Sequence, residues 1–230
     1  IKEVQREMTA KCGQKCTAIR RILVPEKLVE DVQIALGQRL AKTVIGDPAQ
    51  EGVRMGALAG QEQVKEVTDR VNQLAKSQEI VFGSLSSFEV IGADKNKGAF
   101  FSPILFVNDD PFNKTDVHNL EAFGPVSTIM PYKTIEEAIE LAKMGKGSLV
   151  CSIITGDNQI AKEFVLGAAA LYGRILVLNA DCAKESTGHG SPMPQLTHGG
   201  PGRAGGGEEM GGMRGVKHYL QRTAIQGSPT

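Results

Sequence analysis

The chain has 230 residues, of which 41% are apolar and 23% charged, and its 26 basic residues balance its 26 acidic ones. This composition is typical of a globular protein with a core. The chain lacks the surplus of basic residues that is typical of proteins that bind nucleic acids or anionic membranes. No apolar run approaches the roughly 18 residues of a membrane span, and the 4 cysteines are too few for a disulfide scaffold. We therefore expect a cytoplasmic protein with neither nucleic acid nor membrane as partner.

The first half of the chain predicts helices separated by strands. We expect a helix over 1–11, a strand over 18–24, a helix over 25–43, a helix over 61–76 and a short strand over 79–83. Gly13 stands where a helix C-terminus favours a residue that adopts positive φ. Residues 85–98 have little periodicity and are predicted to be a surface excursion.

The second half continues the alternation. Strands are predicted over 99–107, with a kink or sheet edge at Pro103, and over 126–132, 149–155 and 174–179. Helices are predicted over 134–145, where Thr134 is the N-cap and Glu137 completes a capping box, and over 157–173. Strands separated by helices of this length form βαβ units. The fold class is therefore α/β, a doubly wound and mostly parallel sheet with flanking helices.

The character of the chain changes after Asn179. Residues 188–215 contain 11 glycines in 28 positions and cannot bury enough side chain to form a core. We expect an α/β domain over 1–180, a Gly-rich loop over 181–215, and a last segment over 216–230 with a strand at 216–226. A terminal strand beyond a long loop suits pairing with another subunit or domain. The start at Ile1, in the middle of a helical pattern, suggests a piece of a longer protein.

Several apparent motifs lack the neighbouring elements or residues that their function requires. Residues 200–205 match G-x-G-x-x-G, but they lack the preceding strand and the following acidic residue of a dinucleotide site. Cys12 and Cys16 form C-x₃-C without a second ligand pair, and the four histidines have no ligand spacing. We therefore expect no metal.

Cys16 is the candidate nucleophile. It lies between a predicted helix and a predicted strand, close in sequence to four cations, and cations stabilise a thiolate. These cations are Lys11, Lys15, Arg20 and Arg21. Single cysteines are also commonly buried in cores. On the residues alone, a catalytic and a structural Cys16 both remain open.

A family resemblance bears on this choice. The segment GQKCTAIRRILV resembles the nucleophile segment of the aldehyde dehydrogenase superfamily, a G-Q-x-C-x-A core with an Arg five residues after the Cys, here Arg21. Further resembling segments follow in the family's order: IGDPAQEGVRMGAL, GAFFSPILF, LEAFGPVSTIMPYKTIEEAIELA, YGRILVLN and the Gly-rich stretch with its terminal strand. They cover nearly the whole chain.

The resemblance implies the catalytic domain of an aldehyde dehydrogenase. Cys16 would attack the aldehyde, and its backbone N–H would be half of the oxyanion hole. Glu121 would hold the nicotinamide ribose hydroxyls of NADP or NAD, and Phe123 would pack by the nicotinamide. The family's nucleotide-binding domain, oxyanion Asn and water-activating Glu have no counterpart here. The resemblance thus implies that the isolated chain is inactive.

The Gly-rich stretch also resembles a narrower group, the bifunctional proteins of bacterial phenylacetate degradation. That likeness implies a CoA-linked semialdehyde as substrate and a hydratase domain after this chain. The wider resemblance to aldehyde dehydrogenases implies a homo-oligomer joined through the C-terminal strand. Two alternatives come from other classes. One is a non-catalytic assembly module with a buried Cys16, and the other is a cysteine acyltransferase without nicotinamide.

Overall fold

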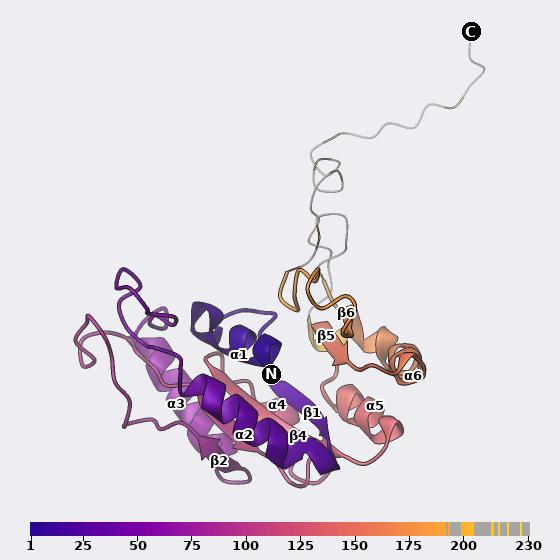
Figure 1. The fold of residues 1–230 in the computed structure, drawn as a ribbon, viewed down its shortest axis with the longest axis horizontal. Helices are drawn as coiled ribbons and strands as arrows, with labels where there is room; N and C mark the ends of the chain where they lie inside the picture. The colour runs from indigo at the N-terminus through magenta and orange to yellow at the C-terminus, as the bar shows by residue number, and fades with distance from the viewer. Residues whose placement is uncertain are drawn as a thin grey trace.

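The computed structural model describes residues 1–191, 193, 199–204 and the single positions 213, 216, 220 and 226. The elements follow one another as labelled in Figure 1. The helices are α1 (Lys2–Thr9), α2 (Val29–Leu40), α3 (Gln61–Leu74), α4 (Asp116–Asn119), α5 (Ile135–Met144) and α6 (Asn158–Ala168). The strands are β1 (Arg21–Pro25), β2 (Glu79–Phe82), β3 (Ile104–Val107), β4 (Val126–Tyr132), β5 (Ser148–Ile154) and β6 (Tyr172–Leu178). Short 3-10 turns are η1 (Ala10–Gly13), η2 (Glu26–Leu28), η3 (Ala169–Leu171) and η4 (Gly202–Ala204).

The strands form two sheets in the described part of the chain. A four-stranded sheet has the order β1-β4-β3-β2, in which β1, β4 and β3 are parallel and β2 runs antiparallel to β3. A second sheet consists of the parallel pair β5 and β6. The predicted α/β class with a mostly parallel sheet is confirmed. The strands are split between two sheets rather than forming the single one expected.

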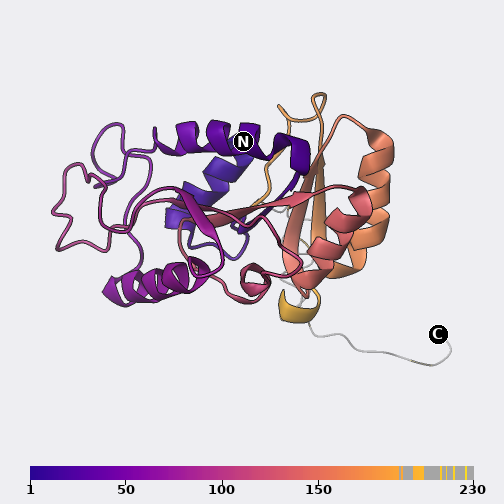
Figure 2. The ribbon, with the colours of Figure 1, turned by 90° about the horizontal axis from the view of Figure 1, so that it is seen from below.

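Helices cover both faces of the larger sheet, as Figure 2 shows. Side chains alternate along β3, so neighbouring residues enter opposite layers. Leu105 packs with Ile129 against α1 and α2, through the buried side chains of Val4, Met8, Leu36 and Leu40. Ile104 and Phe106 instead pack against α3, through Val67, Val71 and Leu74. The α1/α2 layer and the α3 layer are therefore separated by the sheet.

Most local predictions agree with these elements. β4 has the predicted bounds, and the Thr134 side chain accepts a hydrogen bond of 3.4 Å from the Glu137 N–H as the N-cap of α5. The predicted strand over 99–107 is wrong for its first half, because β3 begins only after Pro103. Proline has no N–H to donate to a central ladder. The predicted helix over 157–173 ends early, at Ala168.

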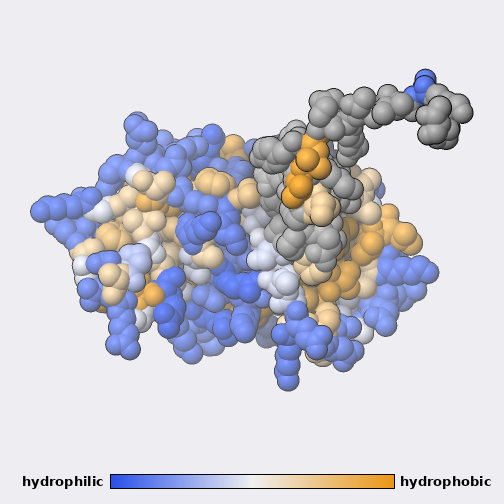
Figure 3. All heavy atoms as spheres, turned by 90° about the horizontal axis from the view of Figure 1, so that it is seen from above, coloured by the Kyte–Doolittle hydropathy of each residue, from blue (hydrophilic) through white to orange (hydrophobic). Residues whose placement is uncertain are grey.

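The end of the molecule formed by β5, β6, α5 and α6 carries exposed apolar side chains. Leu166 is 74% exposed, and the others are Ile154, Ile160 and Val177. Figure 3 shows apolar surface gathered toward this end of the face that it draws. Among the described residues, no helix is both long and apolar enough to cross a membrane. The strand predicted over 216–226 lies almost wholly outside the described residues and stays a prediction.

Candidate active site

The loop that carries Cys16 begins with an unusual backbone turn. Lys11, Cys12 and Gly13 all adopt positive φ, at 52°, 53° and 67°. Gly13 does so as its position predicts, and it also approaches another segment. A Cβ at Gly13 would lie 2.3 Å from the carbonyl oxygen of Gly124 and 2.8 Å from that of Met8. The left-handed backbone of Lys11 and Cys12 could not be read from residue type, because neither residue favours it. Such strain occurs where surrounding structure holds a functional loop.

Gln14 ties this loop to two other segments. Its Nε2 donates to the carbonyl oxygen of Phe123 and to the side-chain oxygen of Gln63, both at 3.1 Å. Its Oε1 accepts a 2.8 Å hydrogen bond from the N–H of Ala59. Gln63 is in the first turn of α3, so the amide of Gln14 joins the cysteine loop to the α3 layer and to Phe123.

Arg20 is the strongest connection between the cysteine loop and the segment before β4. Its guanidinium donates to the carbonyl oxygens of Gly13 at 2.6 Å and Gly124 at 2.5 Å. It also pairs with the Glu121 carboxylate at 3.4 Å and lies 5.3 Å from the centre of the Phe123 ring. Two segments about a hundred residues apart in sequence are thus held by one cation. The sequence indicates Arg20 only as a charge near Cys16 and does not predict this role.

Cys16 itself is exposed, at the turn between η1 and β1. In the described part of the chain, its backbone N–H has no hydrogen-bond acceptor. A free N–H beside an accessible thiol fits a donor for an oxyanion formed at that sulfur. The other cysteines differ in environment. Burial raises the pKa of the Cys12 thiol to about 12 and that of Cys151 to about 11, so both stay protonated at neutral pH.

Two of the four predicted cations are engaged away from the thiol. The ammonium of Lys15 forms a 2.6 Å ion pair with Glu7, whose side chain is only 2% exposed. Arg21 extends toward α5, where it donates to the carbonyl oxygen of Leu141 at 2.8 Å and lies 3.1 Å from Nδ1 of His118. Arg21 thus joins β1 to α5. A cluster of four free cations around Cys16, as the sequence suggested, does not form.

The start of the Gly-rich region packs close to the cysteine loop. His189 is buried, its Nδ1 lies 2.7 Å from the Ser152 hydroxyl, and its carbonyl oxygen accepts a 2.7 Å hydrogen bond from Arg174. Burial lowers the pKa of His189 to about 4, although a hydrogen bond with the Thr17 backbone acts the other way. A neutral, doubly engaged imidazole is a structural anchor and not a base for Cys16.

Glu121 and Phe123, the two predicted cofactor residues, lie beside the cysteine loop. Glu121 is 50% exposed, and its Oε1 faces Arg20. Its second oxygen has no protein donor among the described residues. Phe123 is 36% exposed. An open carboxylate oxygen next to a partly exposed ring fits ribose hydroxyls and a flat aromatic group such as nicotinamide.

Comparison with known proteins identifies the family. A model of the aldehyde dehydrogenase family matches residues 1–225. The chain belongs to the aldehyde dehydrogenase family. The resemblance inferred from GQKCTAIRRILV and the later segments is thereby confirmed.

Two curated relatives cover most of this chain. It is 51% identical over 177 residues to the protein MaoC of Klebsiella aerogenes, a match that covers 76% of this chain and 51% of that one. It is 42% identical over 201 residues to a 3,4-dehydroadipyl-CoA semialdehyde dehydrogenase of Aromatoleum evansii, covering 87% of this chain and 39% of the relative. The chain thus spans 51% and 39% of the length of these two relatives.

Solved aldehyde dehydrogenases share the fold. The chain superposes with a TM-score of 0.80 on a betaine aldehyde dehydrogenase from Staphylococcus aureus in complex with NAD⁺, at 24% identity, covering 96% of this chain and 41% of that one. It has the same TM-score of 0.80 with a 3,6-anhydro-L-galactose dehydrogenase, at 23% identity and with 96% and 43% of the two chains covered. At this identity the likeness supports the fold.

Proposed function

We propose that this chain supplies the nucleophile and one wall of the nicotinamide site of an NAD(P)-dependent aldehyde dehydrogenase. The observation that carries the proposal is the exposed Cys16 in a loop whose Gln14 bonds to the Phe123 carbonyl and whose Arg20 pairs with Glu121. The loop with the thiol and its free N–H is thereby joined to the segment that carries the open carboxylate. The cofactor, when bound, supplies the acceptor for the hydride.

The roles follow from the chemistry of each group. The Cys16 thiolate attacks the aldehyde carbon, and its own N–H stabilises the oxygen that becomes negative. After oxidation the substrate is a thioester on Cys16, which water releases as a carboxylic acid. Glu121 accepts hydrogen bonds from ribose hydroxyls, and Phe123 packs against the ring. The cofactor is NADP or NAD, since the residues that distinguish them are not in this site.

The substrate class that we propose is a CoA-linked semialdehyde of aromatic catabolism, phenylacetate degradation being the predicted pathway. The relative named 3,4-dehydroadipyl-CoA semialdehyde dehydrogenase supports the class. We further propose that the chain is the catalytic part of a longer, bifunctional homo-oligomer and has no dehydrogenase turnover alone. The exposed apolar residues Ile154 and Leu166 support association with further protein surface.

The two alternatives fit the site less well. A non-catalytic assembly module would have a buried Cys16, whereas this thiol is exposed. A cysteine acyltransferase would need a base at the thiol. Among the described residues no histidine pairs with Cys16, and the His189 ring is hydrogen-bonded elsewhere.

The test is the alkylation of Cys16 by iodoacetamide across pH, mapped by peptide mass. We expect Cys16 to react at least tenfold faster than Cys12 and Cys151, because those two thiols are protonated and poorly accessible. Cys16→Ser should abolish the fast phase and the NAD(P)⁺ reduction of the full-length protein. Fast alkylation confined to another cysteine, or turnover retained by Cys16→Ser, would refute the proposed nucleophile.

A further inference from the structure

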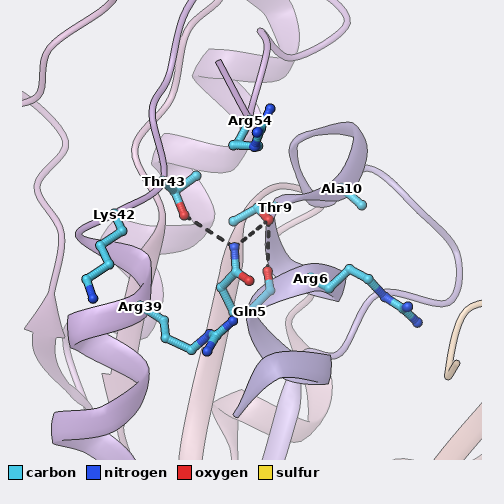
Figure 4. A pocket seen from close by; sticks show the side chains of 8 residues that line it. All are labelled: Gln5, Arg6, Thr9, Ala10, Arg39, Lys42, Thr43 and Arg54. Atoms are coloured by element: carbon cyan, nitrogen blue, oxygen red, sulfur yellow. Dashed lines mark hydrogen bonds between the residues drawn. The ribbon is translucent and has the colours of Figure 1, made fainter. Parts of the chain in front are cut away.

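A cleft of about 540 Å³ lies in the α1/α2 layer, away from Glu121 and Phe123. Figure 4 shows its eight lining residues, which come from α1 and the start of η1, from the end of α2 and from the loop that follows. They are Gln5, Arg6, Thr9, Ala10, Arg39, Lys42, Thr43 and Arg54. We call this the basic cleft. Its volume falls within the range of small-molecule and cofactor sites.

The basic cleft holds four cationic side chains and no acidic one. Arg6 is neutralised by Glu3 at 2.8 Å and by Glu7 at 3.6 Å. In the part of the chain that the structure describes, the other three form no ion pair. These are Arg39, Lys42 and Arg54. Three unpaired cations in one cleft create a positive electrostatic potential, which attracts an anionic ligand.

The floor of the basic cleft is polar and fixed. The Gln5 amide lies between the hydroxyls of Thr9 and Thr43, 3.4 Å from each, and the Thr9 hydroxyl donates to the Gln5 carbonyl at 2.8 Å. These contacts, drawn in Figure 4, join α1 to the segment after α2. Hydroxyls and an amide among several guanidinium and ammonium groups suit a phosphate-bearing ligand.

The position of the basic cleft favours the substrate over the cofactor as the source of the phosphates. The groups that fit the nicotinamide lie with Gln63 at the start of α3, on the other side of the sheet from α2. Ala10 is only six residues before Cys16, which limits their separation to about 22 Å of extended chain. The extended pantetheine arm of CoA has a length comparable to this separation.

We propose that the basic cleft binds the phosphorylated nucleotide end of a CoA-linked substrate while its aldehyde reaches Cys16. This inference rests on the proposed function, because it assigns the substrate of the same thiol. It assigns no role to the residues of the nicotinamide wall.

The experiment measures the dissociation constants of CoA and of NADP⁺ for the full-length protein by titration calorimetry. The cleft variant is Arg39→Gln with Lys42→Gln, and the matched control is Lys65→Gln with Lys76→Gln, two exposed cations of α3 and its C-terminal end. We expect CoA binding to weaken at least tenfold in the cleft variant and less than twofold in the control. NADP⁺ binding should change less than twofold in both.

The outcomes separate this inference from the proposed function. Equal CoA affinity in the cleft and control variants would overturn the inference, as would a weakening confined to NADP⁺. The wild-type protein could oxidise neither propanal nor any CoA-linked aldehyde and still bind CoA more tightly than the cleft variant does. This result would refute the proposed dehydrogenase function and support CoA binding in the basic cleft. Because Arg39 and Lys42 are exposed, both variants should fold, which a thermal melt verifies.

Discussion

Replacing Arg20 by Met should destabilise the fold and weaken the attachment of the cysteine loop to the segment before β4. The substitution keeps the aliphatic stem but removes the hydrogen bonds to the carbonyl oxygens of Gly13 and Gly124, at 2.6 and 2.5 Å. Hydrogen bonds from a charged donor contribute about 1.5 kcal/mol or more each. The pair with the half-exposed Glu121 adds little, since exposed pairs contribute about 0–1 kcal/mol. We therefore expect a loss of about 3 kcal/mol, because the Gly13 carbonyl is left without a donor among the described residues and the Gly124 carbonyl keeps only the Val126 N–H, at 2.8 Å.

For a chain of this length, such a loss lowers the melting temperature by about 6–12 °C. Differential scanning calorimetry of the chain measures it, and the KM of the full-length protein for NAD(P)⁺ should rise because Glu121 and Phe123 lose their support. Arg70→Met is the matched control, since the described contact of Arg70 is a 3.2 Å hydrogen bond to the Gln73 side chain. An Arg20→Met melt within about 1 °C of the wild type and of Arg70→Met would refute the reasoning.

Two further predictions concern the loop that carries Cys16 and the histidine packed near it. Gly13→Ala should cost more than about 2 kcal/mol in urea unfolding, because positive φ is strained for alanine and its Cβ would meet the Gly124 carbonyl at 2.3 Å. Gly52→Ala carries the same backbone strain without a neighbour within 4 Å, so equal losses would show that the close approach has no effect. The pKa of His189 is about 4 in the folded chain, against an ordinary value of 6.5, so the folded state binds this proton more weakly than the unfolded state. The folding stability is therefore fully present above pH 6.5, and about 3 kcal/mol of it is lost as the pH falls to 4. His189→Asn should flatten this dependence, and parallel pH profiles would contradict the assignment.

The regular elements were predictable because their signals are local. The strand over 126–132 and the N-cap at Thr134 follow from residue type and spacing within a few positions. The division into two sheets was not predictable, since it depends on whether β5 pairs with β1. A strand's apolar pattern does not specify its partner. Arg21, which bonds to α5 rather than to the cysteine loop, lies at this junction.

The residues of the candidate site stay a prediction, and the contacts that hold its loop were not predicted from the sequence. Cys16 was a candidate from its charged neighbours, and Glu121 and Phe123 entered through a family pattern. The structure joins the loop of Cys16 to the segment of Glu121 and Phe123 through Gln14 and Arg20. Nothing in the sequence near Arg20 indicates that its guanidinium bonds to Gly124, which is over a hundred residues away. The partners of a long, flexible cation are set by tertiary packing.

If the proposed function holds, the separation of the two layers lets one loop serve two ligands. Gln14 and Arg20 attach the cysteine loop to Gln63 of α3 and to Glu121, on the side where nicotinamide fits. The same loop continues directly from α1, whose Gln5 and Thr9 line the basic cleft on the other side of the sheet. A thiol on the connection between these layers can be approached from one side by the cofactor and from the other by the substrate. Changes in Arg39 or Lys42 should therefore alter substrate affinity without altering cofactor affinity. Changes in Arg20 should instead alter cofactor affinity without altering substrate affinity.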